Sequence, residues 1–128
     1  MSAMTTPFAR RTLRLEALLV LALALSAYQQ LGASWLQFAV LFVGPDLALL
    51  GYVWGPRTGA WSYNATHGYA GPLLLGLLAQ WVAPAYLPLA LIWVAHIAMD
   101  RALGYGLKSA QGFTWTHLGR IGRNPQPE

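Results

Sequence analysis

The chain has 128 residues, of which 56% are hydrophobic and only 9% are charged, with a formal net charge of +4. A soluble domain carries about 25% charged residues, so the composition excludes a soluble enzyme and a disordered chain. Nucleic-acid binding would need the few basic residues on one face of a soluble fold, and the hydrophobic content argues against it. The absence of cysteine excludes disulfides and thiolate metal sites. These features indicate a small integral membrane protein whose main partner is the lipid bilayer.

Four apolar segments are long enough to cross a bilayer, which requires about 20 mostly apolar residues. They span residues 12–31, 34–55, 59–82 and 84–107. The links between them are short and contain Gly or Pro, so consecutive helices should be antiparallel neighbours. We therefore predict an all-α fold, an antiparallel four-helix bundle with up-down-up-down topology. It forms a single transmembrane domain over residues 1–123, and residues 109–128 are expected to be a polar surface tail.

The basic residues predict the orientation of this bundle. All of them fall on one side of it, and the two loops on the other side carry no charge. They are Arg10, Arg11, Arg14, Arg57, Arg101, Lys108, Arg120 and Arg123. The positive-inside rule then predicts that both termini are cytoplasmic, and we expect the protein in a bacterial inner membrane. Pro45 and Pro72 lie inside the second and third segments and predict a kink in each.

Ionisable side chains inside the predicted spans are costly and are therefore candidates for a functional site. Five of them fall at a similar depth in the cytoplasmic half: Glu16, Asp46, His67, His96 and Asp100. His96 and Asp100 are four residues apart, so they share a helix face. Imidazole and carboxylate ligands suit zinc, iron or manganese, and helical bundles build metal sites from facing helices. The sequence predicts a divalent-metal site formed by Asp46, His67, His96 and Asp100.

Other polar residues near this layer are candidates for catalysis and substrate binding. Glu16 is the candidate general base. An anionic head group would be held by residues at the cytoplasmic end of the last segment and in the tail, namely Arg101, Tyr105, Lys108 and His117. Arg101 directly follows Asp100 and points about 100° away from it around the helix. An equally supported interpretation is that Arg101 only fixes the orientation of its helix at the cytoplasmic surface.

Two other interpretations of the polar layer stay open. The first is structural: His96 pairs with Asp100 and Asp46 with Arg101, as interhelical contacts worth about 0.6 kcal/mol on average. The second is a proton or ion path, which in so small a chain needs a homo-oligomer. The leading hypothesis is metal-dependent hydrolysis of a lipid-like or phosphoester substrate. The alternatives are a non-enzymatic transport role and an accessory subunit of a larger membrane complex.

Several motifs resemble a known family. The most specific is the string from His96 to Lys108, His-Ile-Ala-Met-Asp-Arg-Ala-Leu-Gly-Tyr-Gly-Leu-Lys. With Pro45-Asp46-Leu47, residues 63–67 (Tyr-Asn-Ala-Thr-His) and the Thr-His-Leu-Gly-Arg string at 116–120, it is similar to the bacterial domain-of-unknown-function family 4260, over roughly residues 10–123. That family has no established activity, so the resemblance implies a small four-helix membrane architecture and no function.

A looser resemblance concerns the order of the polar motifs. Pro-Asp, then Thr-His on the next helix, then His-x-x-x-Asp is similar to the membrane-bound metal-dependent hydrolases. This resemblance implies metal ligands at the Asp and His positions of these motifs, which are Asp46, His67, His96 and Asp100. The chain departs from that pattern at two places. Ala48 stands where a second acid is expected, and residues 62–64 lack the His-Arg pair.

Overall fold

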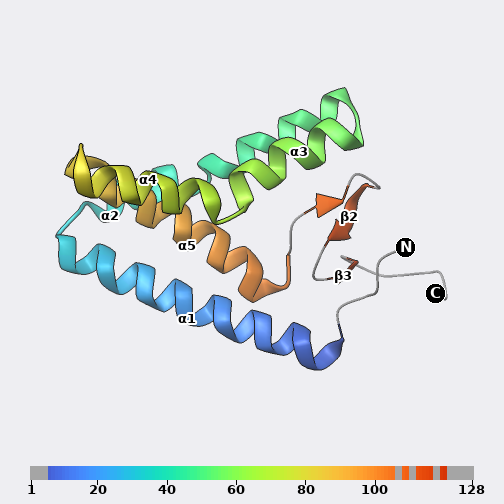
Figure 1. Ribbon diagram of the computed structural model, residues 1–128, viewed down its shortest axis with the longest axis horizontal. Coiled ribbons are helices and arrows are strands. Elements are labelled where there is room, and N and C mark those ends of the chain that lie inside the picture. The colour runs from blue at the N-terminus through green and yellow to red at the C-terminus, as the bar shows by residue number, and fades with distance from the viewer. Residues whose placement is uncertain (1–5, 106–107, 110–111, 117–118, 121–128) are drawn as a thin grey trace.

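The computed structural model describes residues 6–105, 108–109, 112–116 and 119–120, and side chains as far as residue 105. Its elements follow one another as α1 (Pro7–Leu31), α2 (Trp35–Leu41), the 3₁₀ helix η1 (Gly44–Trp54), α3 (Pro56–His67), α4 (Ala70–Trp81), the 3₁₀ turn η2 (Pro84–Tyr86), α5 (Leu87–Leu103), β1 (Lys108–Ser109), β2 (Gly112–Thr116) and β3 (Gly119–Arg120). Helix α1 runs along α5, while η1 packs on α3 and α4 packs on α5 (Figure 1).

Three helical stretches are long and apolar enough to cross a membrane: Pro7–Leu31, Trp35–Trp54 and Pro84–Leu103. This supports the prediction of a helical membrane protein. The predicted third span differs, because residues 59–82 do not form one helix. They are divided between α3 and α4, each of 12 residues.

Proline accounts for both interruptions of the predicted spans. Pro72 has no N–H, and in a continuous helix its ring would clash with the carbonyl of Gly68. The chain is accordingly extended at Gly68 (φ −95°, ψ 154°), and α4 starts two residues later. Before Pro45 the α-helical pattern also ends. The N–H of the next residue, Asp46, bonds to the Val43 carbonyl three residues back (3.0 Å), which is the spacing of a 3₁₀ helix. The kinks expected at the two prolines are thus full changes of helix.

Small residues fill the interior, while large apolar side chains face outward. Among the described residues, the buried apolar side chains are mostly alanines: Ala17, Ala24, Ala60, Ala79, Ala90, Ala95 and Ala98. Leucines such as Leu23, Leu36 and Leu47 are exposed. Small interior residues let membrane helices approach closely, and outward leucines suit a lipid environment. This distribution is the opposite of a soluble core and agrees with membrane insertion.

Two glycines allow η1 to lie directly against α3. A Cβ atom at Gly51 would overlap the Ser62 hydroxyl, and one at Gly59 would overlap the Tyr52 ring. With these glycines in place, the Ser62 hydroxyl donates to the Ala48 carbonyl (2.8 Å). The η1–α3 contact matters for the site because η1 carries Asp46 and α3 carries His67.

The predicted tail contains a short antiparallel sheet with strand order β1-β2-β3. Lys108 pairs with Thr116, and Trp115 pairs with Arg120. Strands β1 and β2 contact α3. The prediction of an all-α chain missed these strands, because strands of two to five residues carry too short an alternation to be recognised.

Gly59 tests the close approach of η1 and α3. The variant Gly59→Ala should lose about 1–3 kcal/mol of stability, because the added methyl group overpacks against the Tyr52 ring. Gly44→Ala is the matched control, since a Cβ there meets no atom within 4 Å. Thermal unfolding in mild detergent measures both variants. Equal midpoints for the two variants would contradict the packing described here.

Candidate metal centre

Three elements contribute to a compact group of two histidines and two aspartates. Asp46 lies in the first turn of η1, and His67 is the last residue of α3. His96 and Asp100 lie one turn apart on α5. Each of the four offers one ligand atom, and these atoms all lie within 4.8 Å of one another. The structure thus brings together the four residues that the sequence singles out, and such a group can hold a metal ion.

The individual distances show how tightly the group is closed. The two histidine Nε2 atoms are 3.1 Å apart. Asp46 Oδ1 lies 3.2 Å from each of them. Asp100 Oδ2 lies 3.5 Å from His67 Nε2 and 3.4 Å from His96 Nε2. A tetrahedral ion with ligands at about 2.0–2.2 Å has edges of about 3.3–3.6 Å between ligand atoms. These five distances are close to tetrahedral edges, and the sixth, between the two aspartates, falls within the 4.8 Å that bounds the group.

Hydrogen bonds at the far side of each ring determine which nitrogen faces the centre. The Nδ1 of His67 lies 3.0 Å from the Tyr63 carbonyl oxygen, and the Nδ1 of His96 bonds to the Phe42 carbonyl oxygen. A carbonyl oxygen only accepts, so each Nδ1 carries a hydrogen. A neutral imidazole then presents an Nε2 lone pair to the centre. Two imidazoles and two carboxylates thus place four acceptor atoms around one point.

The centre is buried on one side and open on the other. The side chains of His67 and His96 are each 3% exposed. The Asp100 side chain is 18% exposed, whereas that of Asp46 is 47% exposed. Aromatic rings flank both imidazoles: Tyr63 stacks on His67 with ring centroids 3.7 Å apart, and Phe42 lies 5.1 Å from His96. Access to the centre is therefore from the side of Asp46.

Thr66 links two of the four residues, and the sequence analysis did not single it out. Its Oγ1 lies 2.9 Å from His67 Nδ1, so it accepts from that N–H. Its hydroxyl lies 3.1 Å from the Pro45 carbonyl and can donate to it, next to Asp46. On α5, the Trp93 Nε1–H donates to the Thr66 carbonyl (2.6 Å). The available signal was the Thr-His pair at a helix end, which is too common to be decisive alone.

Arg101, one of the predicted head-group ligands, contacts both α3 and the start of α4. Its Nη2 donates to the carbonyl oxygen of His67 (3.0 Å), and its guanidinium lies 5.1 Å from the centre of the Tyr69 ring. It therefore bonds to the chain at the interruption between α3 and α4. The expected Asp46–Arg101 pairing is not among the ion pairs of the described residues, where Asp46 contacts the two imidazoles.

Among the described residues, the other predicted site residues are not members of this group. Glu16 is exposed on α1 and is not one of the four clustered residues. Tyr105 follows α5, its backbone N–H donates to the Asp100 carbonyl (2.8 Å), and its side chain is exposed. Lys108 begins β1. His117 lies outside the described residues. Glu16 is outside the four-residue group, and its assignment as general base stays a prediction.

The fold and the site together define a small helical membrane protein with a His₂Asp₂ group between its helices. The chain belongs to the family described as a domain of unknown function, DUF4260, whose model matches residues 10–121. The resemblance seen in the sequence motifs is thereby confirmed, whereas the looser one to membrane-bound hydrolases is not shown. No curated protein and no solved structure matches the chain.

Thr66 provides a test of the hydrogen bonds around the site. Thr66→Val keeps the side-chain shape but removes the hydroxyl, so it should cost about 1 kcal/mol of stability. Thr66→Ser keeps the hydroxyl and should stay closer to the parent. The thermal midpoint in detergent measures the difference. A Thr66→Val protein as stable as the parent would show that the hydroxyl does not hold η1 against α3.

Proposed function

We propose that this is a membrane-embedded metal-binding protein in which Asp46, His67, His96 and Asp100 hold one divalent ion. The observation that carries the proposal is the set of four acceptor atoms that face one centre. The two histidine acceptors are buried and Asp100 is largely so. Buried acceptors without donors are costly, and a cation at the centre of the group removes this cost while it also pairs with Asp46. Mixed imidazole and carboxylate ligands favour zinc, iron or manganese.

The structural interpretation fits this geometry less well. A His–Asp pair that only ties helices together needs an imidazole N–H directed at the carboxylate. Here the N–H of each ring is directed at a backbone carbonyl, on Tyr63 and Phe42. A proton-path role would require one of the rings to carry a second proton at Nε2. A proton at Nε2 can be shared by two of the four acceptor atoms at most, whereas one metal ion can bind all four.

The third crossing of the proposed bundle consists of α3 and α4 together. Each has 12 residues and is about 18 Å long, so the pair spans a hydrocarbon core of about 30 Å. Non-helical backbone at membrane depth is tolerated where it is buried in protein or lines a cavity. Discontinuous helices of this kind carry ion sites in membrane transporters. The interruption at Gly68 directly follows the proposed ligand His67, which supports an ion site at the break between α3 and α4.

We further propose an antiparallel bundle of four crossings in a bacterial inner membrane, with both termini in the cytoplasm. The distribution of basic residues supports this orientation. Reporter fusions at Ala33 and Ala83 should be active in the periplasm, and a fusion after Glu128 should be active in the cytoplasm. A periplasmic C-terminus would contradict the topology.

Hydrolysis is the reaction that the open side of the site supports best. With four protein ligands, hydrolysis would require the ion to take a water molecule as a fifth ligand, and the half-exposed side of the group at Asp46 is where that water could enter. A divalent ion held there would make this water a nucleophile. The water oxygen would form a bond to phosphorus or to an acyl carbon. The bond to the leaving alcohol would break, and the alcohol would take up the proton that the water releases. Release of alcohol or phosphate from lipid analogues, dependent on added metal, measures this activity.

Metal content tests the proposal directly. Protein purified in mild detergent, without chelators or a histidine-rich tag, should contain about one divalent ion per chain. His96→Ala should lose the ion, and Asp100→Asn should lose most of it, because an amide retains the shape of the carboxylate but is a poor anionic ligand. Glu16→Gln is the matched control, since Glu16 is outside the four-residue group. Elemental analysis of all four proteins gives the result.

The possible outcomes separate the interpretations. A parent protein without metal would overturn the proposal and leave the polar layer as interhelical contacts of an accessory subunit. Normal metal content in Asp100→Asn would remove Asp100 from the ligand set. A full complement of metal without turnover would retain the metal site and reject the hydrolase.

A further inference from the structure

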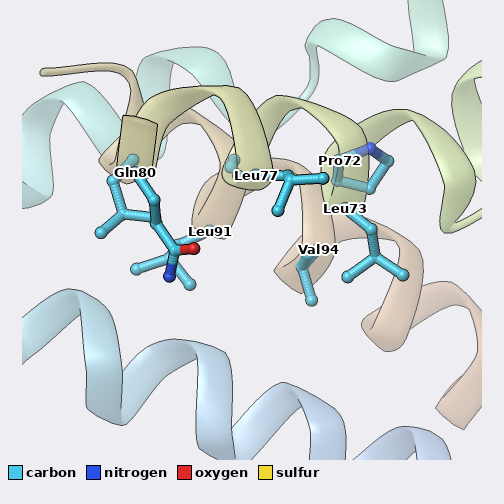
Figure 2. Close-up of a pocket in the computed structure, with 9 residues that line it drawn as sticks. Pro72, Leu73, Leu77, Gln80, Leu91 and Val94 are labelled. Atoms are coloured by element: carbon cyan, nitrogen blue, oxygen red, sulfur yellow. The ribbon is translucent and has the colours of Figure 1, made fainter. Parts of the chain in front are cut away.

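An apolar groove runs between α4 and α5, and none of its lining residues is a histidine. It has a volume of about 300 Å³. Residues of α4 line one wall, among them Leu73 and Leu77, and residues of α5 line the other, among them Leu91 and Val94 (Figure 2). Gln80 lies at one end. The half-buried Gly76 and the buried Ala90 also line it, and these small residues let α4 and α5 lie close together along the groove.

The length and the lining of the groove select the kind of occupant. Its residues on α4 extend from Pro72 to Gln80, a helical length of about 12 Å. The lining along this length is apolar except for Gln80. An extended hydrocarbon chain matches such a lining, whereas a helix of a second copy, about 10 Å wide with its side chains, would lie across the opening of the groove.

A positive charge stands on the same helix face as the groove. Arg101 follows Val94 by seven residues, which is close to two full turns, so both lie on one side of α5. Tyr69, whose ring lies 5.1 Å from the Arg101 guanidinium, precedes the groove residues Pro72 and Leu73 by three and four positions. Arg101 and Tyr69 thus lie beyond the end of the groove that is opposite Gln80.

Within the described part of the chain Arg101 forms no ion pair with a carboxylate, since the ion pairs there join the two histidines to Asp46 and Asp100. One of its five N–H groups donates to the His67 carbonyl. The planar guanidinium has further donors for an anion and suits phosphate recognition. In the proposed topology Arg101 lies toward the cytoplasmic surface and the groove extends into the hydrocarbon region.

From this arrangement we propose that the groove between α4 and α5 is a binding site for an anionic bilayer lipid. One acyl chain lies along Leu73, Leu77, Leu91 and Val94, and the phosphate of the head group contacts Arg101. Charge complementarity and the apolar lining of the groove carry the inference together. The lipid site does not require an ion at the His₂Asp₂ group, so it goes beyond the proposed metal function.

The test uses the full-length protein in phosphatidylcholine vesicles with lipids that carry a spin label on the acyl chain. The immobilised component of the spectrum should show about fivefold stronger association of phosphatidylglycerol than of phosphatidylcholine. Arg101→Gln should bring this ratio close to one. Arg57→Gln is the charge control, because Arg57 is exposed at the start of α3, far along that helix from its end at His67. It should retain the selectivity of the parent.

A second pair of variants tests the groove itself and does not alter the charge. Gly76→Leu places a side chain in the groove and should remove the selective component, because the acyl chain has no space. Gly76→Ala is its control, since a Cβ there lies 3.7 Å from Ala90 Cβ, an ordinary contact. Equal association of the two lipids with the parent, or unchanged selectivity in Gly76→Leu, would overturn the proposal. A parent dimer that Gly76→Leu dissociates, with no lipid selectivity, would assign the groove to a second copy and also overturn it.

Discussion

The hydrogen bonds from each imidazole Nδ1 to a backbone carbonyl are the constraint on which the site depends. They turn the other nitrogen of His67 and of His96 toward the same point, where the two aspartates also converge. If either ring were turned over, an N–H would face the centre and would simply donate to a carboxylate. The orientation of the rings therefore decides whether the group acts as a cation site or as an interhelical contact.

A helix interruption supplies one of the two carbonyl groups that orient the imidazoles, that of Phe42, whereas the Tyr63 carbonyl lies within α3. In a continuous helix the Phe42 carbonyl would accept from the Asp46 N–H, but that N–H bonds to Val43, which leaves the Phe42 oxygen available to His96. The carbonyl of His67, at the end of α3, accepts from Arg101. Backbone groups freed inside a membrane must find partners within the protein. Here the side chains around the site provide them, so the prolines that break the helices also help to build the centre.

The sequence predicts the members of the site better than it predicts the surrounding structure. Ionisable residues stand out in apolar spans, and their depth follows from a regular helical rise, so the convergence of Asp46, His67, His96 and Asp100 was accessible without coordinates. The same depth argument included Glu16, because depth carries no information about which side of a helix faces the other helices. Glu16 is exposed on α1, so its depth alone did not show which side of the helix it occupies.

Other features depend on contacts between distant parts of the chain, which cannot be predicted from the spacing of residues in the sequence. The effect of Pro72 falls on Gly68, four residues earlier, so the helix ends at His67 and not at the proline. The roles of Thr66 and Arg101 follow from hydrogen bonds between elements that are distant in the sequence. The sheet from β1 to β3 has strands too short to predict.

X-ray absorption spectroscopy of the purified, metal-loaded protein tests the central claim most directly, because it reports the atoms that surround the ion. The account predicts a first shell of nitrogen and oxygen at about 2.0–2.2 Å, with the outer-shell scattering of two imidazole rings per ion. Loss of one ring in His67→Ala would assign one of the two to His67. A shell of oxygen alone, without imidazole scattering, would contradict the claim that both histidines direct their Nε2 atoms at one bound cation.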